Sequence, residues 1–266
     1  MICIMNTGAP DLAEAHLKRF ARGYPKVQRF SNILLNLYCK EGRLEEATQV
    51  FFQSIENGTA NSVTGNTMLG ICQKSKNIEN GLEIFYWMKA EGLANVISHK
   101  LILEALYAAS HFKEMQDIVS TAPADIQADT RVMAYKIDAI RKLKSYELAI
   151  KEIDGLLSTP GLDRREREGV LISKAYCLVN VQQFGEAEGI FRQLLKDNLT
   201  ENHRVRVLCG LVFTHNVRED EAPEISAELE SWRGKRNERS NRDIHCALKI
   251  LTRQYPSLKM AAPAPV

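Results

Sequence analysis

Apolar and polar positions repeat along this chain with a period of about 34 residues. The stretch YCKEGRLEEATQVF, Tyr38–Phe51, returns in worn form as ICQKSKNIENGLEIF, Ile71–Phe85. In each of the five inner copies a central residue, usually small, has a large apolar residue three positions before it and another four positions after it, which places all three on one helix face. The first and last copies lose part of this pattern at Arg19, Glu219 and Ser226. The pattern therefore predicts one amphipathic helix per copy, centred on Ala15, Ala47, Gly81, Met115, Ala149, Ala187 and Ala222.

A second, more apolar stretch precedes each of these helices. SNILLNLYCK (residues 31–40) and GNTMLGICQK (residues 65–74) are too apolar for a helix with one solvated side, so we expect first helices that pack on both sides. A 34-residue helix–turn–helix cannot bury its apolar face alone, and stacked copies share one core.

The predicted fold class is therefore all-α: a right-handed α-solenoid of about six helix–turn–helix repeats of 34–35 residues. It has a concave groove, twelve or thirteen helices and almost no β-structure. We expect one solenoid over residues 1–255 with degenerate first and last units. The small, Pro-rich end suggests a flexible tail over residues 256–266.

Composition narrows the class further. With 45% hydrophobic and 26% charged residues, the 266-residue chain is typical of a folded protein, and no apolar run is long enough to span a membrane. The first residues lack the features of a signal peptide, although a longer parent chain could carry a transit peptide. The net charge of +2 is uneven, because residues 31–230 are acidic and both ends are basic. An acidic middle disfavours a phosphate ligand and favours a basic partner segment.

Two units resemble a known repeat family. SNILLNLYCKEGRLEEATQVFFQSIENGTAN and GNTMLGICQKSKNIENGLEIFYWMKAEGLAN look like pentatricopeptide repeats, through the Asn-x-Leu-Leu first helix and the CKEGRLEEA turn. Later units, such as ISKAYCLVNVQQFGEAEGIFRQLLKDN, are more similar to tetratricopeptide repeats. The resemblance covers roughly residues 10–230, and both families are helical binding modules.

The pentatricopeptide resemblance implies candidate RNA-reading positions. In that family a residue early in the first helix and the last residue of the unit together read one base. Carried over to this chain, the early positions are Asn32, Asn66 and Lys100, and the closing positions are Asn61, Asn95 and Asp129. The next unit has Ala134, which cannot hydrogen-bond a base. The alternative is that the asparagines cap helices and turns.

Two further features are candidates for partner contacts. Tyr86 and Trp87 are adjacent on a helix and cannot both point inward, so one of them can anchor a partner; the alternative is packing against the next unit's first helix. RGKRNERSNR, residues 233–242, is a basic patch that suits nucleic acid or an acidic partner, or else a solvated linker. Its basic residues are Arg233, Lys235, Arg236, Arg239 and Arg242.

No residues indicate catalysis, a metal or a cofactor. The six cysteines form no CxxC pair, and four of them, Cys39, Cys72, Cys177 and Cys209, fall on first helices as small buried hydrophobes. No phosphate-binding loop or hydrolase motif is present, so we expect no enzyme activity. The leading hypothesis is a non-enzymatic adaptor that binds a protein or peptide in its groove, in a reducing compartment such as the cytoplasm. The alternative is a single-stranded RNA-binding protein.

Overall fold

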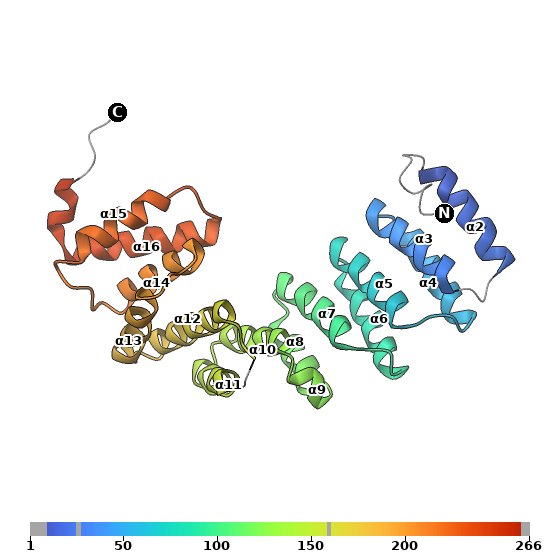
Figure 1. Cartoon of the computed structure of the whole chain (residues 1–266), viewed down its shortest axis with the longest axis horizontal. Helices are drawn as coiled ribbons and strands as arrows, with labels where there is room; N and C mark the ends of the chain where they lie inside the picture. Colours follow the sequence, from blue (N-terminus) through green and yellow to red (C-terminus); the bar gives the residue numbers. More distant parts are fainter. Residues whose placement is uncertain (1–9, 25–27, 159–160, 262–266) are drawn as a thin grey trace. The chain divides into compact units, whose positions relative to one another are not determined.

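The computed structural model describes residues 10–24, 28–158 and 161–261, and every regular element in these ranges is a helix (Figure 1). The chain divides into two compact units, residues 1–139 (unit 1) and 140–266 (unit 2). The helices are α2 (Pro10–Gly23), α3 (Gln28–Glu41), α4 (Leu44–Glu56), α5 (Ser62–Lys74), α6 (Ile78–Ala90), α7 (Val96–Ala108), α8 (Phe112–Ser120), α9 (Ala124–Gln127), α10 (Thr130–Lys142), α11 (Tyr146–Ser158), α12 (Arg164–Asn180), α13 (Phe184–Leu195), α14 (Glu201–Phe213), α15 (Ala222–Trp232), α16 (Glu238–Gln254) and the 3-10 helix η1 (Pro256–Ala261).

Six helix pairs account for most of these elements, which confirms the predicted helical-repeat fold. The pairs are α3–α4, α5–α6, α7–α8, α10–α11, α12–α13 and α14–α15, and their first helices begin 34 residues apart from α3 to α12. The described residues form more helices than the twelve or thirteen expected. The extra elements are the one-turn α9, which follows the short α8, and the unpaired end helices α2 and α16.

First helices form a row within each unit. In unit 1, α3 packs against α5 and α5 against α7; in unit 2, α12 packs against α14 and α14 against α16 (Figure 1). Each inner first helix therefore contacts its own second helix and a first helix on either side. This two-sided burial explains why these helices are so apolar.

The predicted central residue of the repeat is buried in the inner copies, and in the first and last copies the set of buried positions is shifted along the helix. Ala47, Met115, Ala149 and Ala187 have no exposed surface. In α2 the predicted Ala15 is exposed and its neighbour Glu14 is buried instead. In α15 the buried residues are Ala222, Ile225 and Leu229, three positions later than the alignment predicts, because a longer turn separates α14 from α15.

Close helix contacts depend on two glycines. A methyl group added at Gly210 of α14 would lie 2.2 Å from Cζ of Phe191, whose side chain in α13 is fully buried. At Gly65 of α5 it would lie 2.5 Å from Sδ of Met88. The backbones of these helices therefore approach more closely than any other residue allows.

The turns within each helix pair share a left-handed residue. Gly42 has a φ of 70°, and the equivalent residues of the later pairs also have positive φ values although none is glycine. These residues are Lys76, Ser110, Lys144, Gln182 and His215. Because the left-handed region costs an L-residue about 1–2 kcal/mol, the packing of the helix pairs must outweigh this local strain.

The single solenoid over residues 1–255 stays a prediction, since the chain clusters into two units that are described separately. Where a flexible tail was expected, Pro256–Ala261 form η1, and Leu258 packs against the core of unit 2. Residues 262–266 lie outside the described residues.

Candidate functional site

The charges are sorted by helix layer. In unit 1 the first helices α3 and α5 each carry a net charge of +1 and α7 carries none. The first helix α10, whose residues are divided between the two units, carries +3. The second helices α4, α6 and α8 carry −3, −1 and −1. In unit 2 the first helices α12, α14 and α16 carry +2, +1 and +2, and the second helices α11, α13 and α15 carry −2, −1 and −3.

This separation changes the meaning of the acidic middle of the chain. The excess carboxylates lie on the second helices, so the exposed side of the first helices, here called the first-helix face, is neutral to basic. The acidic net charge of residues 31–230 is an average over two helix layers of opposite sign. The repulsion of phosphate that this average predicts therefore does not apply to the first-helix face.

The first pair of predicted reading residues, Asn32 and Asn61, is joined through Thr64. The Thr64 hydroxyl lies 2.9 Å from Asn32 Oδ1 and 3.0 Å from Asn61 Oδ1. Asn61 also caps α5, since its Oδ1 accepts from the backbone N–H of Thr64 at 3.0 Å. Asn61 therefore has the capping role that was the alternative interpretation. Asn32 lies inside α3 and not at its end, and its oxygen contact leaves the amide N–H groups as the donors that it can offer to a ligand.

The second pair repeats this arrangement 34 residues later. The Ser98 hydroxyl donates to Asn66 Oδ1 at 2.6 Å, and Asn95 caps α7 by accepting from the backbone N–H groups of Ile97 and Ser98. Asn66 Nδ2 lies 3.4 Å from Asn95 Oδ1, so the two reading residues touch. We call each set, Asn32–Thr64–Asn61 and Asn66–Ser98–Asn95, an amide rung.

The third pair is an ion pair and not an amide rung. Lys100 Nζ donates to Asp129 at 2.9 Å, and Asp129 caps α10 through the N–H groups of Arg131 and Val132. Burial opposes ionisation of Asp129, but the bonds from Lys100 and from the backbone together lower the pKa of its carboxyl group. Ala134 stands at the corresponding position of α10 and is exposed, so this position of the next repeat holds no amide.

Two exposed aliphatic residues accompany the rungs. Val63 and Ile97 are the second residues of α5 and α7, and their exposed fractions are 57% and 58%. They occupy the same register, 34 residues apart, beside the capping asparagines. They were not among the residues predicted from the sequence, although their position in the repeat was visible there. Apolar surface next to hydrogen-bond donors can cover the flat face of a base or an apolar side chain.

The aromatic pair has a definite arrangement. Tyr86 is 50% exposed and lies against Phe85, with ring centroids 5.8 Å apart. Trp87 is half-buried and meets the ring of Phe51 in α4 edge-on at 5.3 Å. Trp87 thus packs against α4, the second helix of the preceding repeat. The alternative interpretation was packing against the first helix of the next repeat, α7, and it is Phe85 that makes this contact, with its ring centroid 4.9 Å from that of His99.

The basic patch is partly neutralised. Arg233 pairs with Glu230 at 3.1 Å, and Arg236 pairs with Glu201 of α14 at 2.7 Å. Lys235 and Arg242 are exposed, and the side chain of Arg239 lies outside the described residues. Arg239 and Arg242 belong to α16 and not to a linker, since α16 begins at Glu238.

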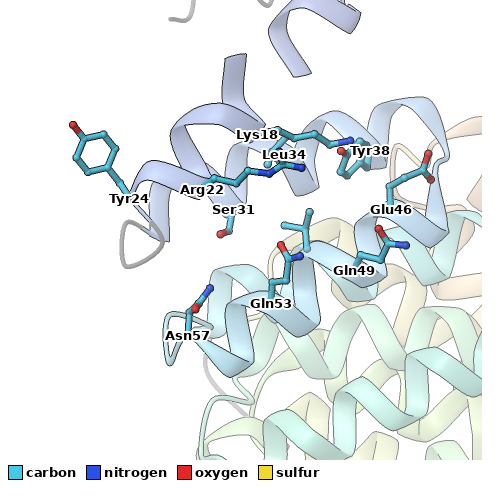
Figure 2. A pocket seen from close by; sticks show the side chains of 11 residues that line it. Lys18, Arg22, Tyr24, Ser31, Leu34, Tyr38, Glu46, Gln49, Gln53 and Asn57 are labelled. Atoms are coloured by element: carbon cyan, nitrogen blue, oxygen red, sulfur yellow. The ribbon is translucent and has the colours of Figure 1, made fainter. Parts of the chain in front are cut away.

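A polar pocket of about 360 Å³ lies between α2, α3 and α4 (Figure 2). Lys18 and Arg22 of α2 line one side, and Gln49, Gln53 and Asn57 line the other, at α4 and the residue that follows it. Lys18 is neutralised by Glu14 at 2.6 Å, while Arg22 has no ion-pair partner among the described residues. The pocket can hold a small polar molecule. Arg22 alone does not indicate which chemical class of ligand this would be.

Buried thiols behave as core residues. Cys72, Cys177 and Cys209 are buried and Cys246 is exposed; burial raises the pKa of Cys72 to about 11 and that of Cys209 to about 12. Cys3 and the side chain of Cys39 lie outside the described residues. Within the described ranges no three metal-ligating side chains come together, and no helix is long and apolar enough to cross a membrane.

Comparisons with known proteins agree with this architecture. The family model named PPR repeat matches residues 31–59, which include most of α3 and all of α4. Two pentatricopeptide repeat-containing proteins of Arabidopsis thaliana are 26% identical over 113 residues and 32% identical over 95 residues. These matches cover 42% and 35% of this chain, but only 17% and 13% of the relatives' own lengths.

One solved structure shows the same fold over nearly the whole chain. The crystal structure of a tetratricopeptide repeat protein from Parabacteroides merdae has a TM-score of 0.53 and covers 94% of this chain and 95% of its own. Its sequence identity is 11%, so the likeness concerns the fold alone.

Proposed function

The chain is a helical-repeat protein of the pentatricopeptide- and tetratricopeptide-like kind, and we propose that the first-helix face of unit 1 binds single-stranded RNA. The observation that carries this proposal is that the two amide rungs and the neutral-to-basic charge occur on the same layer of helices. Helical repeats of this kind are generally binding modules, and we propose that this chain acts without catalysis and without a cofactor.

The rungs support base recognition because they are already ordered. Hydroxyl groups of Thr64 and Ser98 hold the oxygens of Asn32 and Asn66, so little side-chain freedom remains to be lost on binding. The neighbouring Val63 and Ile97 offer apolar surface for the base faces. Donors held beside exposed apolar surface fit a nucleobase, which has a polar edge and a flat apolar face.

Two rungs supply only part of the affinity. Each read or stacked base is worth about 1–3 kcal/mol, so two bases give roughly 2–6 kcal/mol, whereas a micromolar Kd requires about 8 kcal/mol. The remainder has to come from contacts between basic side chains and phosphates. Binding should therefore weaken steeply as salt is raised.

A protein or peptide partner is the second candidate for this face. The charge argument for that hypothesis was the acidic middle of the chain, whose acidic residues lie mainly on the second helices. RNA therefore has the better electrostatic match here. The reducing compartment expected from the unpaired cysteines is retained as part of the proposal.

Fluorescence anisotropy with labelled single-stranded RNAs tests the proposal. We expect binding at low salt, preference for single-stranded over duplex RNA, and a loss of about 10-fold in affinity for Asn66→Ala, with no loss for Gln49→Ala on α4. Pull-downs from ribonuclease-treated lysate, with the wild type and with Asn66→Ala, test the second candidate, a protein or peptide partner. If no RNA pool binds at low salt while a protein partner is lost on Asn66→Ala, the RNA proposal is wrong.

A further inference from the structure

The second helices of unit 1 carry an exposed surface that RNA binding does not use. It consists of Glu45, Phe52 and Glu56 of α4 with Glu79, Glu83 and Tyr86 of α6, and is here called the acidic-aromatic face. Glu45 and Glu79 share one register position of the repeat, and Phe52 and Tyr86 share another, each pair 34 residues apart. Along α4 the spacing of positions 45, 52 and 56 puts all three residues on one side of the helix.

The two aromatic residues are large, exposed and held in place. Phe52 is 57% exposed and Tyr86 is 50% exposed. Each ring lies against a buried neighbour, since Phe51 is 6.0 Å from Phe52, and the buried Phe85 lies beside Tyr86 in the same way. The edge-on contact between Phe51 and Trp87 links α4 to α6, and the two exposed rings occupy the same register of these linked helices. Rigid exposed aromatics are the residues that most often dominate binding energy at protein interfaces.

The carboxylates around these rings have no ion-pair partners in the described part of the chain. By contrast, two acids on second helices of unit 2 are neutralised: Glu188 of α13 pairs with Arg192 at 2.6 Å, and Glu228 of α15 pairs with Arg204. Glu45 and Glu79 lie in first turns, where the helix dipole stabilises negative charge. Glu56 is the last residue of α4, where the dipole disfavours it, so the fold itself does not explain this charge.

We propose that the acidic-aromatic face docks a basic, amphipathic segment of a partner protein. Apolar side chains of the segment cover Phe52 and Tyr86, and its Lys or Arg residues pair with the surrounding carboxylates. Charge complementarity selects this occupant, because unpaired carboxylates repel the phosphates of RNA and attract cations. The chain then holds RNA on one layer of helices and a protein on the other.

The segment fits best as a helix. Neighbouring packed helices are about 8–10 Å apart, and residues i and i+7 of a helix are separated by about 10.5 Å along its axis. A helix that crosses α4 and α6 can therefore place one apolar residue on each exposed ring. Basic residues on its flanks then face the four glutamates.

Two matched double variants of the full chain test this proposal. The probe is a labelled peptide of Lys and Leu in an amphipathic helical pattern, with a peptide that has Glu in place of Lys as the charge control. Phe52→Ser/Tyr86→Ser should weaken binding of the Lys/Leu peptide by about 10-fold or more and leave RNA affinity unchanged. Val63→Ser/Ile97→Ser removes two aliphatic residues of the same spacing from the first-helix face. It should weaken RNA binding and leave peptide binding unchanged.

A further variant and a size measurement complete the test. Glu56→Gln/Glu83→Gln should weaken binding of the Lys/Leu peptide and reduce its salt dependence. The proposal is overturned if Phe52→Ser/Tyr86→Ser binds this peptide like the wild type, or if the Glu/Leu peptide binds equally well. It is also overturned if light scattering shows a dimer that this variant abolishes, because the occupant is then a second copy of the chain. The peptide-binding and light-scattering results do not depend on whether RNA binds.

Discussion

Gly210→Ala is the substitution that most sharply tests the packing of the repeats. An alanine in a helix interior is normally better than glycine by about 1 kcal/mol, so on an open helix this change stabilises. At position 210, however, the new methyl carbon would lie 2.2, 2.6 and 2.8 Å from three ring carbons of Phe191. Favourable contacts between carbons are about 3.5–4.0 Å long, so a ring with no exposed surface would have to move by roughly 1 Å or more.

The size of the effect follows from these two opposing terms. Overpacking a well-filled core costs about 1–3 kcal/mol and occasionally more, and a rigid buried ring places this case at the upper end. After subtracting the helix gain of about 1 kcal/mol, we expect Gly210→Ala to lower the free energy of unfolding by about 2 kcal/mol. Gly65→Ala should cost less, because the atoms nearest to it are at the flexible end of Met88.

Urea unfolding followed by far-ultraviolet circular dichroism measures these changes. The matched control is Gly189→Ala in α13, where an added methyl group meets nothing within 4 Å and should stabilise by up to about 1 kcal/mol. Phe191→Leu combined with Gly210→Ala should recover at least about 1 kcal/mol relative to the sum of the single changes, since the smaller side chain makes room. If Gly210→Ala proves as stable as the wild type, α13 and α14 are not packed as described.

Three further changes follow from the local geometry. Ser110→Gly relieves a φ of 65° and should raise the unfolding free energy by about 0.5–1 kcal/mol in the same urea assay; a loss of stability would contradict the left-handed turn. His99 is buried and holds the Asn95 carbonyl at 2.9 Å, and burial lowers its pKa below the usual 6.5. The unfolded chain then takes up the proton first, so stability should fall as pH drops below about 6.5, by at most about 1.4 kcal/mol per pH unit, and His99→Phe should flatten this slope in unfolding curves at about pH 7.5 and 5.5. Glu14 accepts from Arg43 at 2.6 Å and its pKa is about 2, so Glu14→Gln should reduce stability by about 1–3 kcal/mol at neutral pH. In the wild type this contribution is present above pH 4.5 and is lost as pH falls toward 2. Hydrogen exchange at neutral pH should therefore be faster in α2 of the variant than in α2 of the wild type.

The repeat and its core were predictable because burial dominates them. Small residues such as Ala47, Gly81 and Ala149 recur at multiples of 34 residues. Few folds other than stacked helix pairs bury the same face of each helix at this spacing. The last copy failed because the alignment took Ala222 as the central residue, while the longer turn before α15 moves that role to Ile225. A column of single letters does not detect such a slip when an apolar residue happens to fall at both positions.

The turns and the charge layers were missed for different reasons. Residues such as Lys76 and Ser110 carry no left-handed signal, because a strain of about 1–2 kcal/mol is small beside the packing energy of two helices. The charge layers were present in the sequence, but net charge was summed over windows that contain both helices of a unit. Charge summed separately over the first and the second helices of each repeat reveals both layers from the sequence alone.

The candidate site was predictable in position and not in arrangement. Asn61 and Asn95 precede first helices, where capping was foreseen as an alternative. Their links to Asn32 and Asn66 depend on Thr64 of α5 and Ser98 of α7. These contacts form only because neighbouring first helices stack closely, and the sequence does not give that distance. The resemblance to pentatricopeptide repeats predicts these positions, and the stacked helices connect them through Thr64 and Ser98.

The most direct test compares charge reversals on the two layers. Lys40 and Lys74 are exposed and lie at the same register of α3 and α5, whereas the exposed Lys89 and Lys113 lie on the second helices α6 and α8. Lys40→Glu/Lys74→Glu and Lys89→Glu/Lys113→Glu change the net charge equally, and anisotropy titrations with a single-stranded RNA at several salt concentrations compare them. We predict that the first variant loses at least about 10-fold in affinity and has a shallower salt dependence, while the second binds like the wild type. Equal losses in the two variants, or a larger loss in the second, would contradict RNA binding by the first-helix face.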